Sequence, residues 1–150
     1  MDATSVIIER HAELERAFDA FDRVEGGHHR QIRALRSIAG GLAVHSTIEQ
    51  ELLYPAIREL TGRHDRRIER HLEQAHLLEP LLVELGGVLP ADERYEARVG
   101  LLGELFHQHA RDQEMELLPE LRRRLEFEDR VRLGKELLER IHELQGTPSR

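Results

Sequence analysis

The chain has 150 residues but no cysteine and no tryptophan, and only 4% of its residues are aromatic. The lack of cysteine excludes disulfides, thiolate zinc sites, Cys-ligated iron–sulfur clusters and cysteine nucleophiles. No apolar run approaches the roughly 20 residues that a membrane-spanning helix needs, and the first residues lack the basic start and apolar run of a secretory signal. We therefore expect a soluble cytoplasmic protein with no membrane contact.

Basic residues are also in the minority. The chain has 22 Lys and Arg against 29 Asp and Glu, which gives a net charge of -7. The densest basic cluster, Arg122-Arg123-Arg124, is short and is expected to be a solvated face near a helix end. This balance argues against a nucleic acid as the main partner. Histidine, in contrast, is abundant, with ten in the chain.

Strand signals are missing as well, because no segment alternates β-branched and polar residues beyond a few positions. Helix formers dominate, and glycines and prolines divide the chain into a few long pieces with apolar residues three or four apart. This spacing predicts helices near residues 4–25, 29–61, 64–86, 91–125 and 128–145.

The short loops between these pieces predict antiparallel neighbours. The expected fold is all-α, an up-down-up-down four-helix bundle with an additional C-terminal helix. We expect one domain over residues 1–150, with its core at about 5–125. The additional helix, at about 128–145, either caps the bundle or forms a homodimer contact.

An internal repeat links the second and fourth predicted helices. His45 stands ten residues before Pro55, and His109 stands ten residues before Pro119, with similar strings between them. A proline inside a helix removes a backbone donor and should kink the helix. The chain therefore reads as one helical hairpin used twice.

Each of the four main predicted helices carries one histidine within its apolar stripe. These are His11, His45, His71 and His109, and Glu49 follows His45 by four residues, about 40° away on the same helix face. A single core histidine is usually a hydrogen-bonded structural residue. Four imidazoles and a carboxylate converging in one core would be costly unless paired, and a bound metal is the most economical explanation.

These residues resemble the hemerythrin family, including the hemerythrin-like HHE cation-binding domains, over roughly residues 5–125. The motifs that carry the resemblance are His11, His45-xxx-Glu49 followed by Leu53-Tyr54-Pro55, His71, and His109 followed by Leu117-Leu118-Pro119. The resemblance implies a four-helix bundle with two non-haem irons joined by an oxo bridge.

The sequence departs from the family pattern in two helices. Many members have a bridging glutamate four residues after the last histidine, where this chain has the neutral Gln113. Other members place an acid five residues after it, where Glu114 stands, although an ideal helix turns Glu114 about 140° from His109 unless the helix bulges. In the third helix, oxygen carriers have two histidines four apart, whereas His76 here stands five residues after His71.

The resemblance thus leaves two ligand sets open. The full set is His11, His45, Glu49, His71, His76, His109 and Glu114. The smaller set omits His76 and Glu114. With a single bridging carboxylate the second metal would bind weakly, and the site would hold one metal only, or a metal other than iron.

Three functions fit these residues. The first is a protein that binds or senses oxygen or a related small ligand, such as nitric oxide or peroxide, at a non-haem iron centre. The second is a di-iron enzyme that handles peroxide or nitric oxide, or an iron storage or repair protein. The third is a metal-free scaffold.

Overall fold

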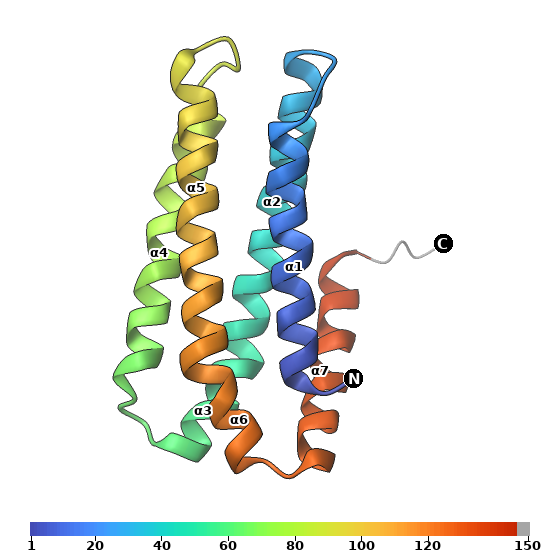
Figure 1. Ribbon diagram of the computed structural model, residues 1–150, viewed down its shortest axis with the longest axis vertical. Helices are drawn as coiled ribbons and strands as arrows, with labels where there is room; N and C mark the ends of the chain where they lie inside the picture. Colours follow the sequence, from blue (N-terminus) through green and yellow to red (C-terminus); the bar gives the residue numbers. More distant parts are fainter. Residues whose placement is uncertain (147–150) are drawn as a thin grey trace.

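The computed structural model describes residues 1–146 and confirms the all-α bundle. Its four long helices are α1 (Ala3–Asp22), α2 (His28–Ile48), α4 (Arg66–Gly86) and α5 (Glu93–Asp112). The α1–α2 pair stands beside the α4–α5 pair, and successive helices run in opposite directions (Figure 1). No strand occurs within residues 1–146, and none of the helices there combines the length and apolarity that a membrane span requires.

Aspartates begin three of the long helices. Asp2, Asp65 and Asp92 each accept a hydrogen bond from a backbone N–H two or three residues later. Such a cap satisfies one of the donors that a helix start leaves unpaired. The cap before α2 is instead Gly27, whose φ of 82° favours glycine. These caps fix where each helix starts, and so which side chains face the core.

The kinks expected at the two prolines are present as π-helical turns. Helix α2 continues through the π turn η1 (Glu49–Leu53) into α3 (Tyr54–Thr61), and α5 continues through η2 (Gln113–Leu117) into α6 (Leu118–Arg124). In each turn the N–H of the residue before the proline bonds to the carbonyl five residues earlier. The wider turn accommodates the proline, which lacks a donor and crowds the carbonyl four residues before it. The sequence repeat is therefore a structural repeat.

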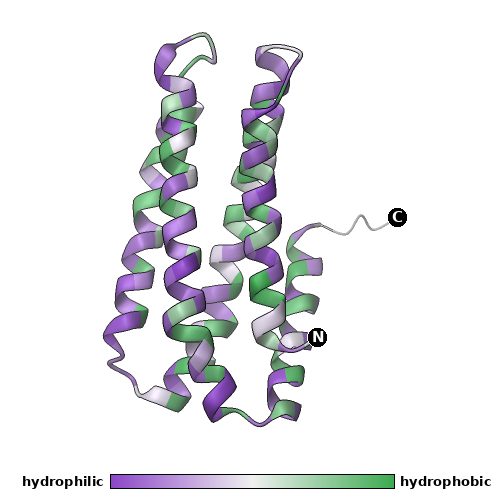
Figure 2. Ribbon diagram, in the orientation of Figure 1, coloured by the Kyte–Doolittle hydropathy of each residue, from purple (hydrophilic) through white to green (hydrophobic). Residues whose placement is uncertain are grey.

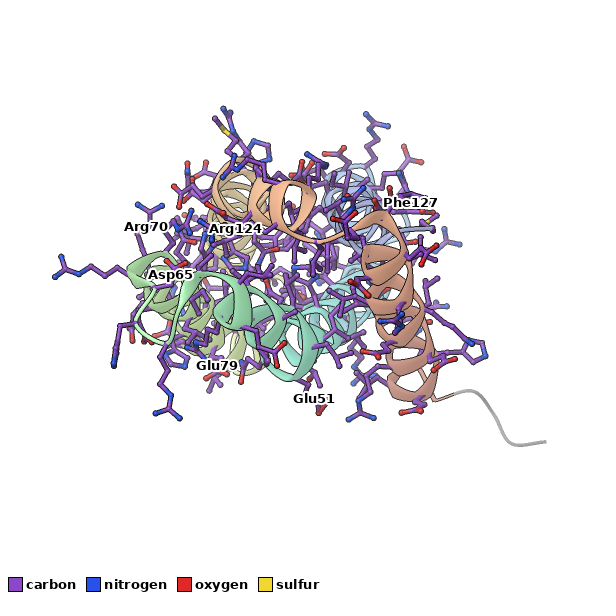
Figure 3. All side chains as sticks on the ribbon, turned by 90° about the horizontal axis from the view of Figure 1, so that it is seen from below. Glu51, Asp65, Arg70, Glu79, Arg124 and Phe127 are labelled. Carbon is purple, nitrogen blue, oxygen red and sulfur yellow. The ribbon has the colours of Figure 1, made fainter. Side chains whose placement is uncertain are left out.

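The apolar core forms two clusters at different levels of the bundle. One cluster, towards α3 and α6, includes Ile48, Leu53 and Ile57, and the other, towards the far loops, includes Leu42 and Phe106. Every long helix carries both hydrophobic and hydrophilic residues (Figure 2). Charged side chains such as Glu51, Arg70 and Glu79 lie at the periphery (Figure 3). The buried histidines lie between the two clusters.

The additional helix, α7 (Phe127–Leu144), packs along α1 and α2 of its own chain. Leu137 and Ile141 join the core cluster on the α3 side. The helix approaches the N-terminus so closely that a Cβ on Gly134 would lie 2.4 Å from the Met1 carbonyl oxygen. The helix thus covers the sides of α1 and α2 and does not close an end of the bundle, and a homodimer contact through its outer face stays a prediction.

Candidate metal centre

Four histidines, one from each long helix, meet in the middle of the bundle. His11, His45, His71 and His109 are all buried. The ring centroids lie 4.8 Å apart for His11 and His45, 6.3 Å apart for His45 and His109, and 5.4 Å apart for His71 and His109. The imidazoles thus form a continuous chain across the core, and Glu49 is buried among them.

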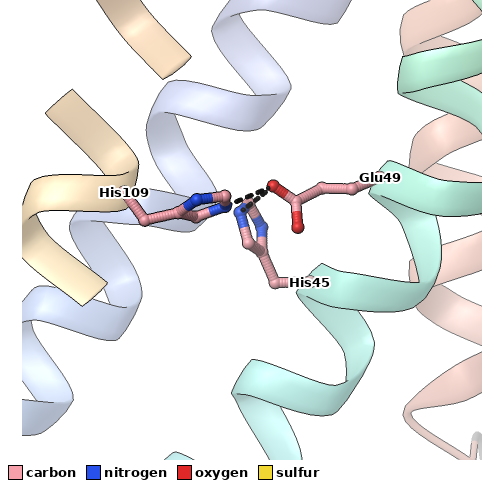
Figure 4. Close-up of side chains that lie close together, drawn as sticks. All are labelled: His45, Glu49 and His109. Carbon is pink, nitrogen blue, oxygen red and sulfur yellow. Dashed lines mark hydrogen bonds and ion pairs between the residues drawn. The ribbon is translucent and has the colours of Figure 1, made fainter. Parts of the chain in front are cut away.

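The tightest group within this cluster is formed by His45, Glu49 and His109. One ligand atom from each residue lies within 4.8 Å of the other two. The Oε2 atom of Glu49 lies 2.8 Å from His109 Nε2 and 3.3 Å from His45 Nε2, and the three side chains point toward one another from α2, η1 and α5 (Figure 4). Two imidazole nitrogens and a carboxylate oxygen on facing helices are suitable donors for a transition metal.

Gln113 occupies the position that corresponds to Glu49 in the second half of the repeat. Each residue opens a π turn four residues after a core histidine, and Gln113 is completely buried. Its amide donates to Glu49 Oε2 and to the Tyr54 hydroxyl at 2.9 Å, and the hydroxyl in turn donates to Glu49 at 3.1 Å. The cluster therefore has one carboxylate where a symmetric site would have two.

Burial and neighbouring charges determine the protonation states of three residues of the cluster, His11, His71 and Glu49. Burial, reinforced by His45, lowers the pKa of His11 to about 3. Burial, reinforced by His109, lowers the pKa of His71 to about 4. Burial alone would raise the pKa of Glu49, but the adjacent His45 and His109 hold it well below its usual value. At neutral pH, His11 and His71 are therefore neutral and Glu49 is ionised, as metal ligands must be.

Without a cation, the donors and acceptors around His11 and Gln113 cannot all be paired. His11 Nε2 lies 3.0 Å from Gln113 Oε1, while His11 Nδ1 lies 2.6 Å from Glu114 Oε2. A neutral ring can donate to only one of these two oxygens. Turning the Gln113 amide over would place its oxygen against the ionised Glu49 instead. Either way, two acceptors face each other.

Two of the imidazoles also have unused nitrogens. Neither ring nitrogen of His45 or of His71 has a hydrogen-bond partner among the described residues. A buried polar atom without a partner is unfavourable by about 1–3 kcal/mol. These orphaned lone pairs, together with one ionised carboxylate, fit a bound transition-metal ion.

Polar partners behind the imidazoles orient two of the rings. Glu114 holds His11 through Nδ1, and Gln74 Oε1 lies 3.1 Å from His109 Nδ1. Gln74 in turn donates to Asp112 at 2.7 Å. A partner on one ring nitrogen fixes which nitrogen of a metal-binding histidine can carry the lone pair. Gln74 and Asp112 were not predicted from the sequence, although each stands three residues after a core histidine, close to it on the helix surface.

The structure does not bring all of the predicted ligands together. His76 is 58% exposed on α4, 3.7 Å from Glu73, because five residues turn it about 140° from His71. Glu114 is half-buried and contacts His11 from the outer side. Gln113, four residues after His109, is the residue that faces the centre, and the π turn widens the helix only from there on. The residues that the structure does gather are His11, His45, Glu49, His71 and His109, with Gln113 and Tyr54.

Comparisons with known proteins agree with this geometry. A family model described as the hemerythrin HHE cation-binding domain matches residues 2–121. The fold is similar to the crystal structure of a hemerythrin HHE cation-binding domain-containing protein from Mycobacterium kansasii, with a TM-score of 0.84. The two chains are 18% identical, and the match covers 98% of this chain and 89% of the other, so it supports the fold alone. No curated protein sequence matches the chain significantly.

Proposed function

Because this chain belongs to the hemerythrin HHE cation-binding domain family, we propose that it is a non-haem iron protein that reversibly binds a small ligand such as oxygen or nitric oxide. The observation that carries the proposal is the buried cluster of four imidazoles around one ionised carboxylate, in which the ring nitrogens of His45 and His71 have no hydrogen-bond partner within residues 1–146. His45, Glu49 and His109 would hold the first iron, and His11 and His71 lie on either side of them.

The donor set favours iron over several other metals. Thiolates are absent from the chain, which disfavours the sites that zinc and Cu(I) form with sulfur. The oxygen-only ligand sets preferred by magnesium and calcium contain no imidazole. Imidazoles with a carboxylate are typical of non-haem iron in helical bundles.

A bound non-haem iron would supply an open coordination position for a small ligand. The protein around it favours binding over turnover. Burial, reinforced by the charge of Glu49, raises the pKa of the Tyr54 hydroxyl, so this group keeps its proton and donates a hydrogen bond to Glu49. A proton held this firmly is poorly suited to general acid catalysis. The Gln113 amide also donates at the centre, to the Tyr54 hydroxyl and to Glu49.

The test is elemental analysis and an absorption spectrum of the full chain purified under air, compared with His45→Ala/Glu49→Ala. We expect iron and ferric charge-transfer bands in the wild type, and loss of most of both in the double variant. Circular dichroism should still show a helical protein. Unchanged metal content in the double variant would refute the assignment of these ligands, and rapid decomposition of peroxide by the wild type would favour the enzyme alternative.

A further inference from the structure

A third carboxylate, besides those of Glu49 and Glu114, reaches the histidine cluster from the solvent side. Glu116 belongs to the same π turn as Gln113, and its Oε2 atom lies 3.6 Å from His71 Nε2. Glu116 is half-buried, yet its Oε2 is inaccessible to solvent and has no hydrogen-bond partner among residues 1–146. Glu116 was not among the ligands predicted from the sequence.

The approach of Glu116 to His71 is not a hydrogen bond. A distance of 3.6 Å is too long, and His71 Nε2 also has no partner among the described residues. His71 is fully buried, so an ion pair would require a charged imidazole in an apolar setting, which is costly. The contact therefore leaves two polar atoms, each able to offer a lone pair, facing one another.

This separation suits two ligands of one metal ion. Ligand atoms about 2.1 Å from a common ion lie roughly 3–3.6 Å from each other at the usual coordination angles. The observed 3.6 Å is at the upper end of this range. An ion between the two atoms would satisfy both lone pairs at once.

Two arginines of α4 hold Glu116 in place. Arg70 donates to the other carboxylate oxygen, Oε1, which leaves Oε2 directed at His71. Arg67 donates to the backbone carbonyl of Glu116 at 3.2 Å. A ligand whose second oxygen is already hydrogen-bonded is oriented before the metal arrives.

We propose that His71 and Glu116 are the protein ligands of a second divalent-cation site, beside the His45–Glu49–His109 group and nearer to the surface of the bundle. The proposal rests on the proposed function in that it assigns the second metal of the same centre. It also explains how the chain compensates for Gln113, since the missing negative charge is supplied three residues further along the same turn. With two protein ligands and a half-exposed carboxylate, this outer ion should bind more weakly and exchange faster than the inner ion.

The test is titration of the metal-free full chain with Mn2+, followed by electron paramagnetic resonance and calorimetry. The wild type should show one tight and one weak class of site. Glu116→Gln should weaken the second class by about tenfold or more, the order of effect seen when a metal site loses a supporting partner, and leave the first class unchanged. His71→Ala should have the same effect, and combining the two substitutions should add little.

Glu73→Gln is the matched control, because it removes a solvent-exposed carboxylate from α4 without touching the cluster. It should leave both classes unchanged. The outer site would be overturned if the wild type bound one tight ion only, or if Glu116→Gln did not weaken the weak class. A wild type that lacks the tight class but keeps a weak class that Glu116→Gln weakens would count against the proposed function and not against this site. Circular dichroism of each variant checks that the bundle is intact.

Discussion

Replacing Gln113 with glutamate tests how the centre balances charge. In the metal-free protein, Gln113 donates to the ionised Glu49 and to Tyr54. Gln113→Glu removes both donors and sets a second carboxylate against the first. Two like charges about 4 Å apart repel by about 4 kcal/mol at an effective dielectric constant of roughly 20. Since the cluster is buried, solvent can relieve little of this.

This destabilisation should be visible in a thermal melt. For a chain of this size each kcal/mol lowers Tm by about 2–4 °C, so metal-free Gln113→Glu should melt roughly 8–16 °C below the wild type. Bound metal should reverse the effect, because the added charge offsets the cations and should tighten the second metal. We therefore expect a larger rise of Tm on metal addition, and more metal per chain, in the variant than in the wild type.

The assay is circular dichroism melting with chelator and with iron, beside elemental analysis. Gln113→Met is the matched control, since it removes the same hydrogen bonds without adding charge. If metal-free Gln113→Glu melts together with Gln113→Met, and its metal content does not rise, the charge argument is refuted.

Three further outcomes follow from contacts at the centre and at the ends of the helices. Glu114→Gln should weaken metal binding by about 10–100-fold while leaving the number of metals unchanged, as expected of a carboxylate that orients a ligand; a lower stoichiometry would instead make Glu114 a direct ligand. Asp2→Ala should lower the free energy of unfolding by about 1 kcal/mol at pH 7, because it removes the cap of α1. The pKa of the Asp2 carboxyl is about 2 in the folded protein, since burial is outweighed by hydrogen bonds from Ser5, Thr4 and Arg130. Its stabilisation is therefore present above about pH 4 and is lost as the pH falls through 2. Urea titrations of the wild type and Asp2→Ala measure this, and a difference in unfolding free energy as large at about pH 1 as at pH 7 would contradict it. Gly134→Ala should lower the free energy of unfolding by about 1–3 kcal/mol, because the new methyl group meets the backbone of Met1, whereas a Tm within 1 °C of the wild type would show that α7 can shift freely.

Helix periodicity was sufficient to predict most of the fold and the centre. The 100° rotation per residue placed His11, His45, His71 and His109 on inward faces, and the four-residue spacing placed Glu49 with them. The structure buries all five side chains. These positions could be predicted because each depends only on the geometry of its own helix.

The rest of the centre depends on relations between helices, which periodicity does not describe. Glu114 contacts His11 across 103 residues of chain, and Glu116 approaches His71 from another helix. Each contact depends on how two helices are rotated against each other. On an ideal helix Glu116, seven residues after His109, lies about 20° from it, whereas Glu114 lies about 140° away. Periodicity alone therefore favours Glu116, but its approach to His71 on another helix cannot be read from a count along one helix.

The two π turns determine where the chain can lose a residue. Each turn holds one residue more than an α-helical turn would. Deleting a single residue within η1 would let the backbone close into a regular helix with the later residues near their present faces, although Pro55 would again crowd the carbonyl four residues before it. A deletion in the regular part of α2 has no extra residue to absorb it. It would rotate everything after it by about 100° relative to the residues before it, and Tyr54 and Ile57 would leave the core. A codon lost from the loop at 87–92, which faces solvent between α4 and α5, changes no such register.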